Sequence, residues 1–401
     1  MKTTIVSING VNYGSTGNIA RQIGELAREK GVEYYNAYPW AAINKQIGRY
    51  DIVIGNKMDK VFNVALGRAT GYAGRFSHIE TKKFLNKLDE LKPDIIHMHN
   101  LHDGFINLKM LFDYIKKNNI KVVWTLHDCW SFTGRCAYFT MSKCYKWKTG
   151  CGDCPQKNCY PKRYRDTTKK MIKLKEKWFG GVEDMVIVTP SAWLKSLAEQ
   201  SFLSEYPIRV INNGIDTKIF IPTESDFRKK HKIENKFIVL GVASAWGKAK
   251  GLDDILTLRK ELDESYAFVL VGTNEDIDKR LPENIISIHR THNQKELAEI
   301  YSAADVYINP TKEENYPTVN MEAVACGTPV ITYNTGGSGE MLDECTGIIV
   351  DTNDVESMKE SIISLKTRKT ERNVNPEKGK EFSFNKRFEE YLDLYYKMLG
   401  E

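Results

Sequence analysis

Glu314 and Glu322 have the residue types and the spacing for chemistry at a shared site. Seven residues separate them, and a predicted helix begins between them. A loop and a helix at this spacing can direct both carboxylates into one pocket. The backbone N–H groups near Thr318 and Val319 would point there too, and a helix N-terminus binds phosphate oxygens. A glycine-rich turn at 336–339 can add further N–H donors. The alternative is that both glutamates are ordinary solvated surface acids.

Two predicted strands and the helix between them must position these residues. Residues 306–308 and 330–333 are β-favouring runs that fit buried parallel strands. Pro317 suits the first turn of the intervening helix, and Gly327 with Pro329 ends it. The result is a βαβ unit, and open α/β sheets bind ligands in the loops at the C-terminal ends of their strands.

Residues 311–337 resemble the signature of the retaining nucleotide-sugar glycosyltransferases of family 4, in which two glutamates at this spacing precede an Ala-Cys-Gly-Thr-Pro-Val run and a Gly-Gly turn. The resemblance implies that Glu314 binds sugar hydroxyls and that Glu322 binds ribose hydroxyls. The chain departs from the family at Asn315-Tyr316-Pro317, where the family carries Gly, an aromatic residue and Gly, and Pro317 has no N–H to donate. The donor-binding residues implied in this segment are Tyr316, Thr318, Val319 and Glu322.

A second loop of the same predicted domain carries lysines. Lys250-Gly251-Leu252 follows a predicted strand at 237–242 and resembles the phosphate-binding lysine of the family. Lys250 is therefore expected to neutralise charge on the leaving diphosphate. Residues 244–246 replace an arginine of the family, and Lys248 is expected to take over part of its charge. Thr291 follows a predicted strand at 285–288, where the family places nucleobase contacts.

The first half of the chain predicts a sheet of its own. Strand candidates alternate with helical stretches, which is typical of a doubly wound parallel sheet. Gly17 lies in a glycine-rich turn that resembles the family loop facing the donor diphosphate and the acceptor. His127 ends a strand and resembles a family histidine beside the donor sugar, where it can bond a hydroxyl or a developing charge. The strand candidates are residues 1–8, 51–54, 94–98, 121–125, 185–189 and 208–211.

Six of the eight cysteines fall within residues 129–159. In a cytosolic protein such clustering indicates metal before disulfides. Cys151-Gly152-Asp153-Cys154 is a tight knuckle, and Cys136 with Cys144 forms the other candidate pair for a structural Zn²⁺. Four sulfur ligands would leave no open position, so the ion would staple a long loop without taking part in catalysis. The alternative is a set of reduced thiols in an aromatic-rich loop.

A basic stretch follows at residues 162–177, with eight lysines and arginines against Asp166 and Glu176. One interpretation is a solvated helix face whose apolar side packs in the core. The other is electrostatic docking on an anionic membrane leaflet, within reach of a lipid-linked acceptor.

Composition sets the remaining bounds. A length of 401 residues predicts two domains, and 41% hydrophobic with 27% charged residues is typical of a globular protein. A net charge of +6 does not by itself indicate nucleic acid. No apolar run approaches the roughly 20 residues that span a bilayer, and the N-terminus lacks a signal peptide pattern, so a cytoplasmic protein is expected. The membrane-docking interpretation of the basic stretch would place it on the inner face of the membrane.

Together these features predict an α/β protein of the GT-B class, with two Rossmann-like domains facing across a cleft. The expected domains are 1–214 on the acceptor side, 215–385 for the nucleotide-sugar, and a helix at 386–401 that crosses back. The resemblance implies retaining transfer of a hexose from a nucleoside-diphosphate sugar to a hydroxyl of a glycan or lipid-linked acceptor, without a catalytic metal. The alternatives are a GT-B epimerase or phosphorylase and, in another class, a zinc-ribbon protein that binds nucleic acid.

Overall fold

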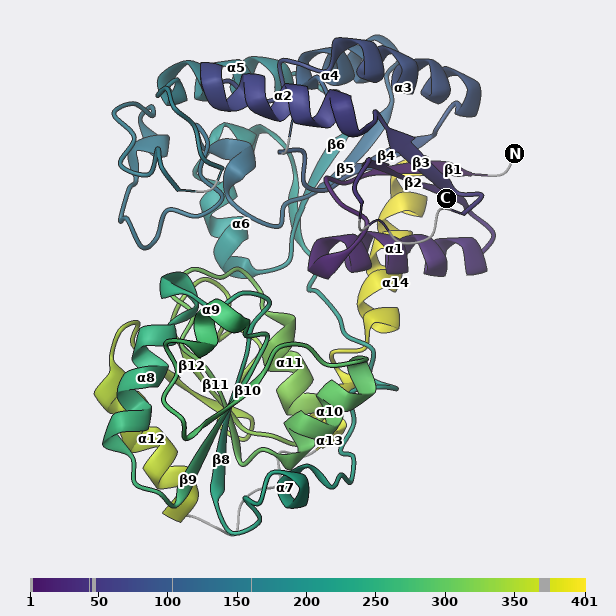
Figure 1. Ribbon diagram of the computed structural model, residues 1–401. Helices are drawn as coiled ribbons and strands as arrows, with labels where there is room; N and C mark the ends of the chain where they lie inside the picture. Colours follow the sequence, from purple (N-terminus) through teal and green to yellow (C-terminus); the bar gives the residue numbers. More distant parts are fainter. Residues whose placement is uncertain (1–2, 43, 45–47, 103, 160, 368–375) are drawn as a thin grey trace. The chain divides into compact units, whose positions relative to one another are not determined.

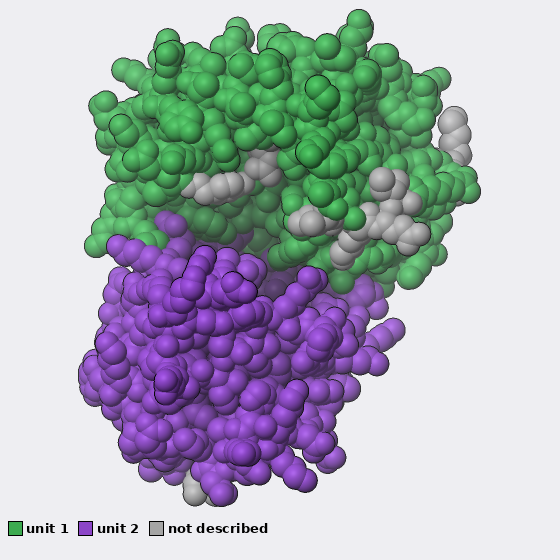
Figure 2. All heavy atoms as spheres, viewed as in Figure 1, with its two compact units in different colours: residues 1–212, 388–401 green, residues 213–387 purple. Residues whose placement is uncertain are grey.

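Two parallel β-sheets organise the chain, and each belongs to its own unit (Figure 1). The computed structural model describes residues 3–42, 44, 48–102, 104–159, 161–367 and 376–401. Unit 1 comprises residues 1–212 together with 388–401, and unit 2 comprises residues 213–387 (Figure 2). No helix among these residues is long and apolar enough to cross a membrane.

Unit 1 is built on a seven-stranded parallel sheet in the order β3-β2-β1-β4-β5-β6-β7. Its central strands are rich in Ile and Val and almost fully buried, as expected where helices cover both faces. The strands are β1 (Thr4–Ile8), β2 (Glu33–Pro39), β3 (Asp51–Ile54), β4 (Ile95–Met98), β5 (Lys121–Thr125), β6 (Met185–Thr189) and β7 (Ile208–Val210).

The helices of unit 1 bury one apolar side against this sheet. In Figure 1, α3, α4 and α5 lie along one face and α1 with α14 along the other. Asn56, Asn107 and Ser191 accept backbone N–H groups at the starts of α2, α4 and α6, which fixes where these helices begin. The helices are α1 (Gly14–Glu29), α2 (Lys57–Thr70), α3 (His78–Leu91), α4 (Leu108–Lys117), α5 (Thr168–Phe179) and α6 (Ala192–Ala198), with short 3₁₀ turns η1 (Trp130–Phe132), η2 (Lys146–Lys148) and η3 (Phe202–Glu205).

The helix α14 (Phe384–Leu399) begins in unit 2 and ends in unit 1. At its start, the N–H of Phe384 donates to the carbonyl oxygen of Ile215. Its later turns are buried in unit 1, where the hydroxyl of Tyr391 bonds that of Thr125 at 3.1 Å and the hydroxyl of Tyr395 bonds His97 Nδ1 at 2.6 Å. The C-terminal residues therefore complete the core of the N-terminal unit.

Unit 2 is built on a six-stranded parallel sheet in the order β10-β9-β8-β11-β12-β13. Helices α8 and α12 cover one face and α10, α11 and α13 the other (Figure 1). The strands are β8 (Phe237–Val242), β9 (Tyr266–Val271), β10 (Ile285–Ile288), β11 (Val306–Asn309), β12 (Val330–Tyr333) and β13 (Gly347–Val350). The helices are α7 (Phe227–Lys230), α8 (Leu252–Glu261), α9 (Glu275–Asp278), α10 (Gln294–Ala303), α11 (Thr318–Ala325), α12 (Val355–Thr367) and α13 (Pro376–Lys380), with the 3₁₀ turn η4 (Lys248–Lys250).

The alternating strands and helices agree with the α/β prediction, and two strands were missed. The β2 sequence contains Asn and Pro, which are uncommon inside strands, and β13 is a four-residue edge strand. The sequence predicted Pro317 in the first turn of α11. Pro317 lies instead at the N-cap of this helix, one residue before the first turn.

Candidate active site

The order of the strands in unit 2 identifies where a ligand should bind. The strand β8 pairs with β9 on one side and with β11 on the other, so the order in which successive strands are added to the sheet reverses there. In open α/β sheets such a switch point opens a crevice at the C-terminal strand ends. The loops after β8 and β11 meet there, because the N–H of Lys312 donates to the carbonyl oxygen of Ala249 at 2.8 Å.

Lys250 and Glu314 join these two loops directly. The ammonium of Lys250 donates to Glu314 Oε2 at 2.7 Å, and Glu314 Oε1 accepts the N–H of Asn315 at 3.0 Å. The two side chains are 32% and 17% exposed, so the pair is only partly shielded from water. The structure thus places a cation and a carboxylate together at the switch point.

Glycines let the loops approach this closely. Gly251 has φ +69°, and an added Cβ would lie 2.2 Å from the carbonyl oxygen of Pro310. Gly336 has φ +58°, and its Cβ would lie 1.8 Å from the carbonyl oxygen of Glu314. The N–H of Gly337 donates to Asn315 at 2.6 Å. The turn at 336–339 therefore supports the backbone around Glu314, and the Gly337 amide, expected as a ligand donor, bonds within the protein.

Glu322 lies on the second turn of α11, beside two buried tyrosines. Its Oε2 accepts the hydroxyl of Tyr301 at 3.1 Å, and Thr318 also hydrogen-bonds this carboxyl. Burial raises the pKa of Glu322 to about 7. Tyr307, on β11, is fully buried, and its pKa is raised by burial and by the charges of both Glu322 and Glu314. The structure thus brings both glutamates into the surroundings of one tyrosine.

The start of α11 is fixed by a buried asparagine. Asn309 Nδ2 donates to Asn320 Oδ1 at 2.8 Å, and Asn320 Nδ2 donates to the carbonyl oxygen of Ser338 at 3.0 Å. Thr318 and Val319 occupy the first turn and are half-buried. First-turn N–H groups have no partner within a helix, so they remain donors for an anion.

Three other predicted donor-binding residues lie in unit 2 with less support. Lys248 is exposed in η4, and Thr291 is half-buried after β10. Within the described part of the chain, neither hydrogen-bonds to Glu314 or Glu322. Tyr316 is buried, and its carbonyl oxygen accepts Asn213 Nδ2 at 3.2 Å.

Gly17 and His127 belong to unit 1. Gly17 lies in the first turn of α1, and an added Cβ would lie 2.6 Å from the backbone carbon of Asn12, so close packing requires glycine there. His127 follows β5, is buried, and hydrogen-bonds through Nε2 to Nδ1 of His99 at 3.0 Å. Burial lowers the pKa of His127 to about 4, so its imidazole is neutral at pH 7. Its role toward a ligand stays a prediction.

His97 has a packing role. Its Nδ1 bonds the hydroxyls of Tyr34 and Tyr395, and its Nε2 bonds Thr125 at 2.9 Å. Both ring nitrogens are therefore occupied, and burial lowers its pKa to about 3.

The predicted zinc ligands are free cysteines that lie partly in contact. Cys136 hydrogen-bonds Cys154, which lowers the pKa of the Cys154 thiol to about 6, and Cys151 Sγ accepts the N–H of Gly134 at 3.3 Å. Burial raises the pKa of Cys151, and the charge of Cys144 contributes to this shift. Across the described residues, no three metal-binding side chains are grouped to hold an ion. Zinc binding by these four residues stays a prediction.

One lysine of the basic stretch, Lys175, does not lie on an exposed helix face. Most lysines of this stretch are exposed, but Lys175 is fully buried in α5. Its ammonium donates to the carbonyl oxygens of Trp130 at 2.5 Å and Thr133 at 3.0 Å and lies 3.5 Å from the centre of the Trp130 indole. Lys175 thus ties α5 to the loop that follows His127.

The sequence did not identify the roles of four buried tyrosines, two beside the glutamates and two in the last helix. Tyr301 and Tyr307 carry no motif, although Tyr307 stands in the strand that leads to Glu314. Tyr391 and Tyr395 fall in the helix predicted at residues 386–401, for which no hydrogen bonds were predicted. Their spacing of four residues was the available signal for a polar edge, since residues four apart share one helix face.

Comparison with known proteins adds two family matches. Residues 33–219 match the model described as Glycosyltransferase Family 4, and residues 223–382 match Glycosyl transferases group 1. The chain is 25% identical over 358 residues to the putative colanic acid biosynthesis glycosyl transferase WcaC of Escherichia coli K12, covering 85% of each sequence.

Solved structures share the fold over the whole chain. Sucrose-phosphate synthase from Thermosynechococcus elongatus superposes with a TM-score of 0.73 at 16% identity, covering 100% of both chains. Anabaena Alr3699/HepE in complex with UDP-glucose superposes with a TM-score of 0.64 at 14% identity, covering 97% of this chain and 99% of that one.

Proposed function

The chain is a glycosyltransferase with the GT-B fold that its sequence predicts, and from this premise we propose that it transfers a hexose from a nucleoside-diphosphate sugar to a hydroxyl group with retention at the anomeric carbon. The observation that carries the proposal is the Lys250–Glu314 pair at the switch point of unit 2. It brings together a cation, which we assign to the phosphate, and a carboxylate, which we assign to the sugar hydroxyls.

The leaving group defines what the site must supply. As the bond from sugar to diphosphate breaks, negative charge grows on the diphosphate oxygens, and preorganised donors stabilise it. We assign that role, without a catalytic metal, to Lys250 and to the first-turn amides of α11 at Thr318 and Val319. Lys248 and Gly17 are proposed to contact the diphosphate as well.

The remaining contacts orient the donor. We assign Glu314 to the sugar hydroxyls and Glu322 to the ribose hydroxyls, with neither acting as a nucleophile. We assign His127 to a sugar hydroxyl or to a developing charge, as the family resemblance implies. Tyr316 and Thr291 are assigned to the nucleoside end of the donor.

The acceptor is proposed to be a glycan or a lipid-linked glycan of surface polysaccharide synthesis. The support is the likeness to a relative named for colanic acid biosynthesis. We place the reaction in the cytoplasm, on the inner face of the membrane, where the exposed Lys162 and Arg165, which precede α5, would face anionic lipid. Co-sedimentation with vesicles that contain or lack anionic lipid tests this location.

Thermal-shift measurements against a panel of nucleoside diphosphates test donor binding, because a bound ligand raises the melting temperature by mass action. The selected nucleotide then defines the sugar donors to assay for release of nucleoside diphosphate. An epimerase would return a nucleoside-diphosphate sugar without net release of nucleoside diphosphate, and a phosphorylase would need inorganic phosphate and release a sugar phosphate. Failure of every nucleotide to stabilise the protein would contradict the proposal.

A further inference from the structure

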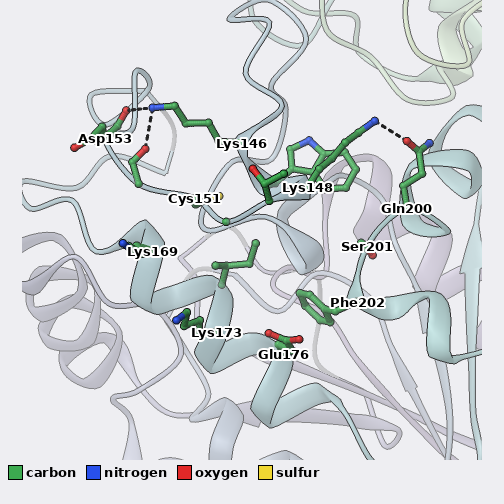
Figure 3. A pocket seen from close by; sticks show the side chains of 15 residues that line it. Lys146, Lys148, Cys151, Asp153, Lys169, Lys173, Glu176, Gln200, Ser201 and Phe202 are labelled. Atoms are coloured by element: carbon green, nitrogen blue, oxygen red, sulfur yellow. Dashed lines mark hydrogen bonds between the residues drawn. The ribbon is translucent and has the colours of Figure 1, made fainter.

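Unit 1 contains a cavity that shares no residue with the proposed transfer site. Its volume is about 850 Å³, within the range of small-molecule sites. Three segments enclose it: the cysteine-rich loop at 146–153, one side of α5, and residues 200–202 (Figure 3). A ligand there would touch both this loop and α5.

Lysines dominate the charge of this cavity. Lys146 and Lys148 come from the loop, and Lys169 and Lys173 lie one turn apart on α5 (Figure 3). The acids in the lining are Asp153 and Glu176. Four ammonium groups against two carboxylates leave an excess of positive charge.

That charge is not neutralised by the contacts the lysines make. Lys146 Nζ donates to the carbonyl oxygens of Gly152 and Asp153, both at 3.1 Å, and Lys148 Nζ donates to the amide oxygen of Gln200 at 2.6 Å. These acceptors are neutral, so each ammonium keeps its charge. Within the described ranges, none of the four lysines forms an ion pair with a carboxylate.

The cavity also has an apolar side. Trp147, Phe202 and Ile172 belong to its lining, and Trp147 is held by ring contacts with Phe132 and Phe139 at 5.1 and 5.4 Å. The Lys148 ammonium lies 5.6 Å from the centre of the Trp147 ring, which helps to keep it on the cavity wall. Cations beside a rigid aromatic surface suit a ligand that carries both phosphate and a sugar ring.

We propose that this cavity binds a phosphorylated sugar. Lys169 and Lys173 bind the phosphate oxygens, with Lys146 and Lys148 adding charge from the opposite wall, and the sugar ring packs toward Phe202. The same chemistry occurs in a free sugar phosphate and in the headgroup of a lipid-linked sugar diphosphate. The concave shape favours such a compact ligand over a flat membrane surface.

The test compares two double variants of the full chain. Lys169→Ala with Lys173→Ala removes charge from the cavity, and Lys170→Ala with Lys177→Ala removes equal charge from the same helix outside the lining. Calorimetric titration with a hexose 1-phosphate is expected to show binding to the parent, about tenfold to hundredfold weaker binding to the first variant, and a change within about twofold for the second.

A second arm separates the two ligand sources. Vesicles carrying a polyprenyl diphosphate sugar are compared with vesicles of equal charge that lack it. If the protein is retained preferentially on the vesicles that carry the diphosphate sugar, and only the variant with Lys169→Ala and Lys173→Ala loses this retention, the cavity binds a lipid headgroup. If the protein binds hexose 1-phosphate but shows no such retention, the ligand is a soluble sugar phosphate. Equal losses in both double variants, or absence of binding in both arms, overturn the proposal. The nucleotide thermal shift, which reports on unit 2, is expected to be unchanged in both variants, so failure of this proposal is distinct from failure of the transferase assignment.

Discussion

Replacing Glu314 by glutamine separates the two roles proposed for the Lys250–Glu314 pair. The substitution keeps the shape of the side chain but removes the negative charge 2.7 Å from the Lys250 ammonium. The free lysine and the loss of a nearby carboxylate both favour an anionic ligand. Glu314→Gln is therefore expected to bind the nucleoside diphosphate more tightly than the parent, while transferring sugar more slowly.

The magnitude follows from the exposure of the pair. An ion pair that is partly open to water contributes about 1 kcal/mol, and 1.4 kcal/mol is a factor of about ten in affinity. Release of Lys250 should thus tighten nucleotide binding by about fivefold to tenfold. Loss of a charge-assisted bond of about 1.5–3 kcal/mol to the sugar should lower turnover by about tenfold to more than a hundredfold.

A double-mutant cycle read by isothermal titration calorimetry checks this reasoning. Lys250→Ala alone should weaken nucleotide binding by about tenfold to a hundredfold, and in that background Glu314→Gln should lose most of its strengthening effect. If Glu314→Gln weakens nucleotide binding, or strengthens it equally without Lys250, the two side chains do not act as the paired site described here.

Three further predictions concern stability and metal. The pKa of Glu322 is about 7 in the folded chain against an ordinary 4.5, so the folded chain binds more protons than the unfolded chain between these pH values. The contribution of Glu322 to the free energy of unfolding therefore falls as pH rises from about 4.5 to 7. Glu322→Gln should show a smaller fall when urea unfolding is measured across this pH range, and an unchanged pH profile would refute this. Tyr395→Phe should lose about 1 kcal/mol of stability by removing the bond to His97, whereas Tyr396→Phe, its neighbour outside the network, should lose less; equal losses in urea unfolding would contradict the role of that bond. Protein purified without added zinc should contain about one zinc per chain by metal analysis if the four cysteines are ligands, and metal-free protein of equal thermal stability would contradict it.

The fold was predictable because many of its strands are short runs rich in Ile and Val that alternate with helical stretches. Residues 51–54, 121–125 and 285–288 were identified with their bounds unchanged. Of the two strands that were missed, β2 is specified by its pairing with β1 and β3 more than by its own composition, which includes Asn and Pro. The β13 sequence, Gly-Ile-Ile-Val, is a β-favouring run, so a local pattern contained the signal for that strand.

The candidate site was predictable only where a motif marks it. Glu314 and Lys250 stand 64 positions apart, and their contact depends on β8 and β11 being neighbours in the sheet. The burial of Lys175 could not be inferred, because seven other basic residues around it suggest a solvated face. Its acceptors, the carbonyls of Trp130 and Thr133, lie about forty residues earlier in the chain.

The path of α14 has a consequence for biosynthesis. Residues 388–401 leave the ribosome after all of unit 2, yet Tyr391 and Tyr395 fill the interior of unit 1. During translation, unit 2 can form most of its sheet while His97 and Thr125 of unit 1 are still exposed to solvent or chaperones. A premature stop that removes these last turns would therefore damage the half of the protein that was made first.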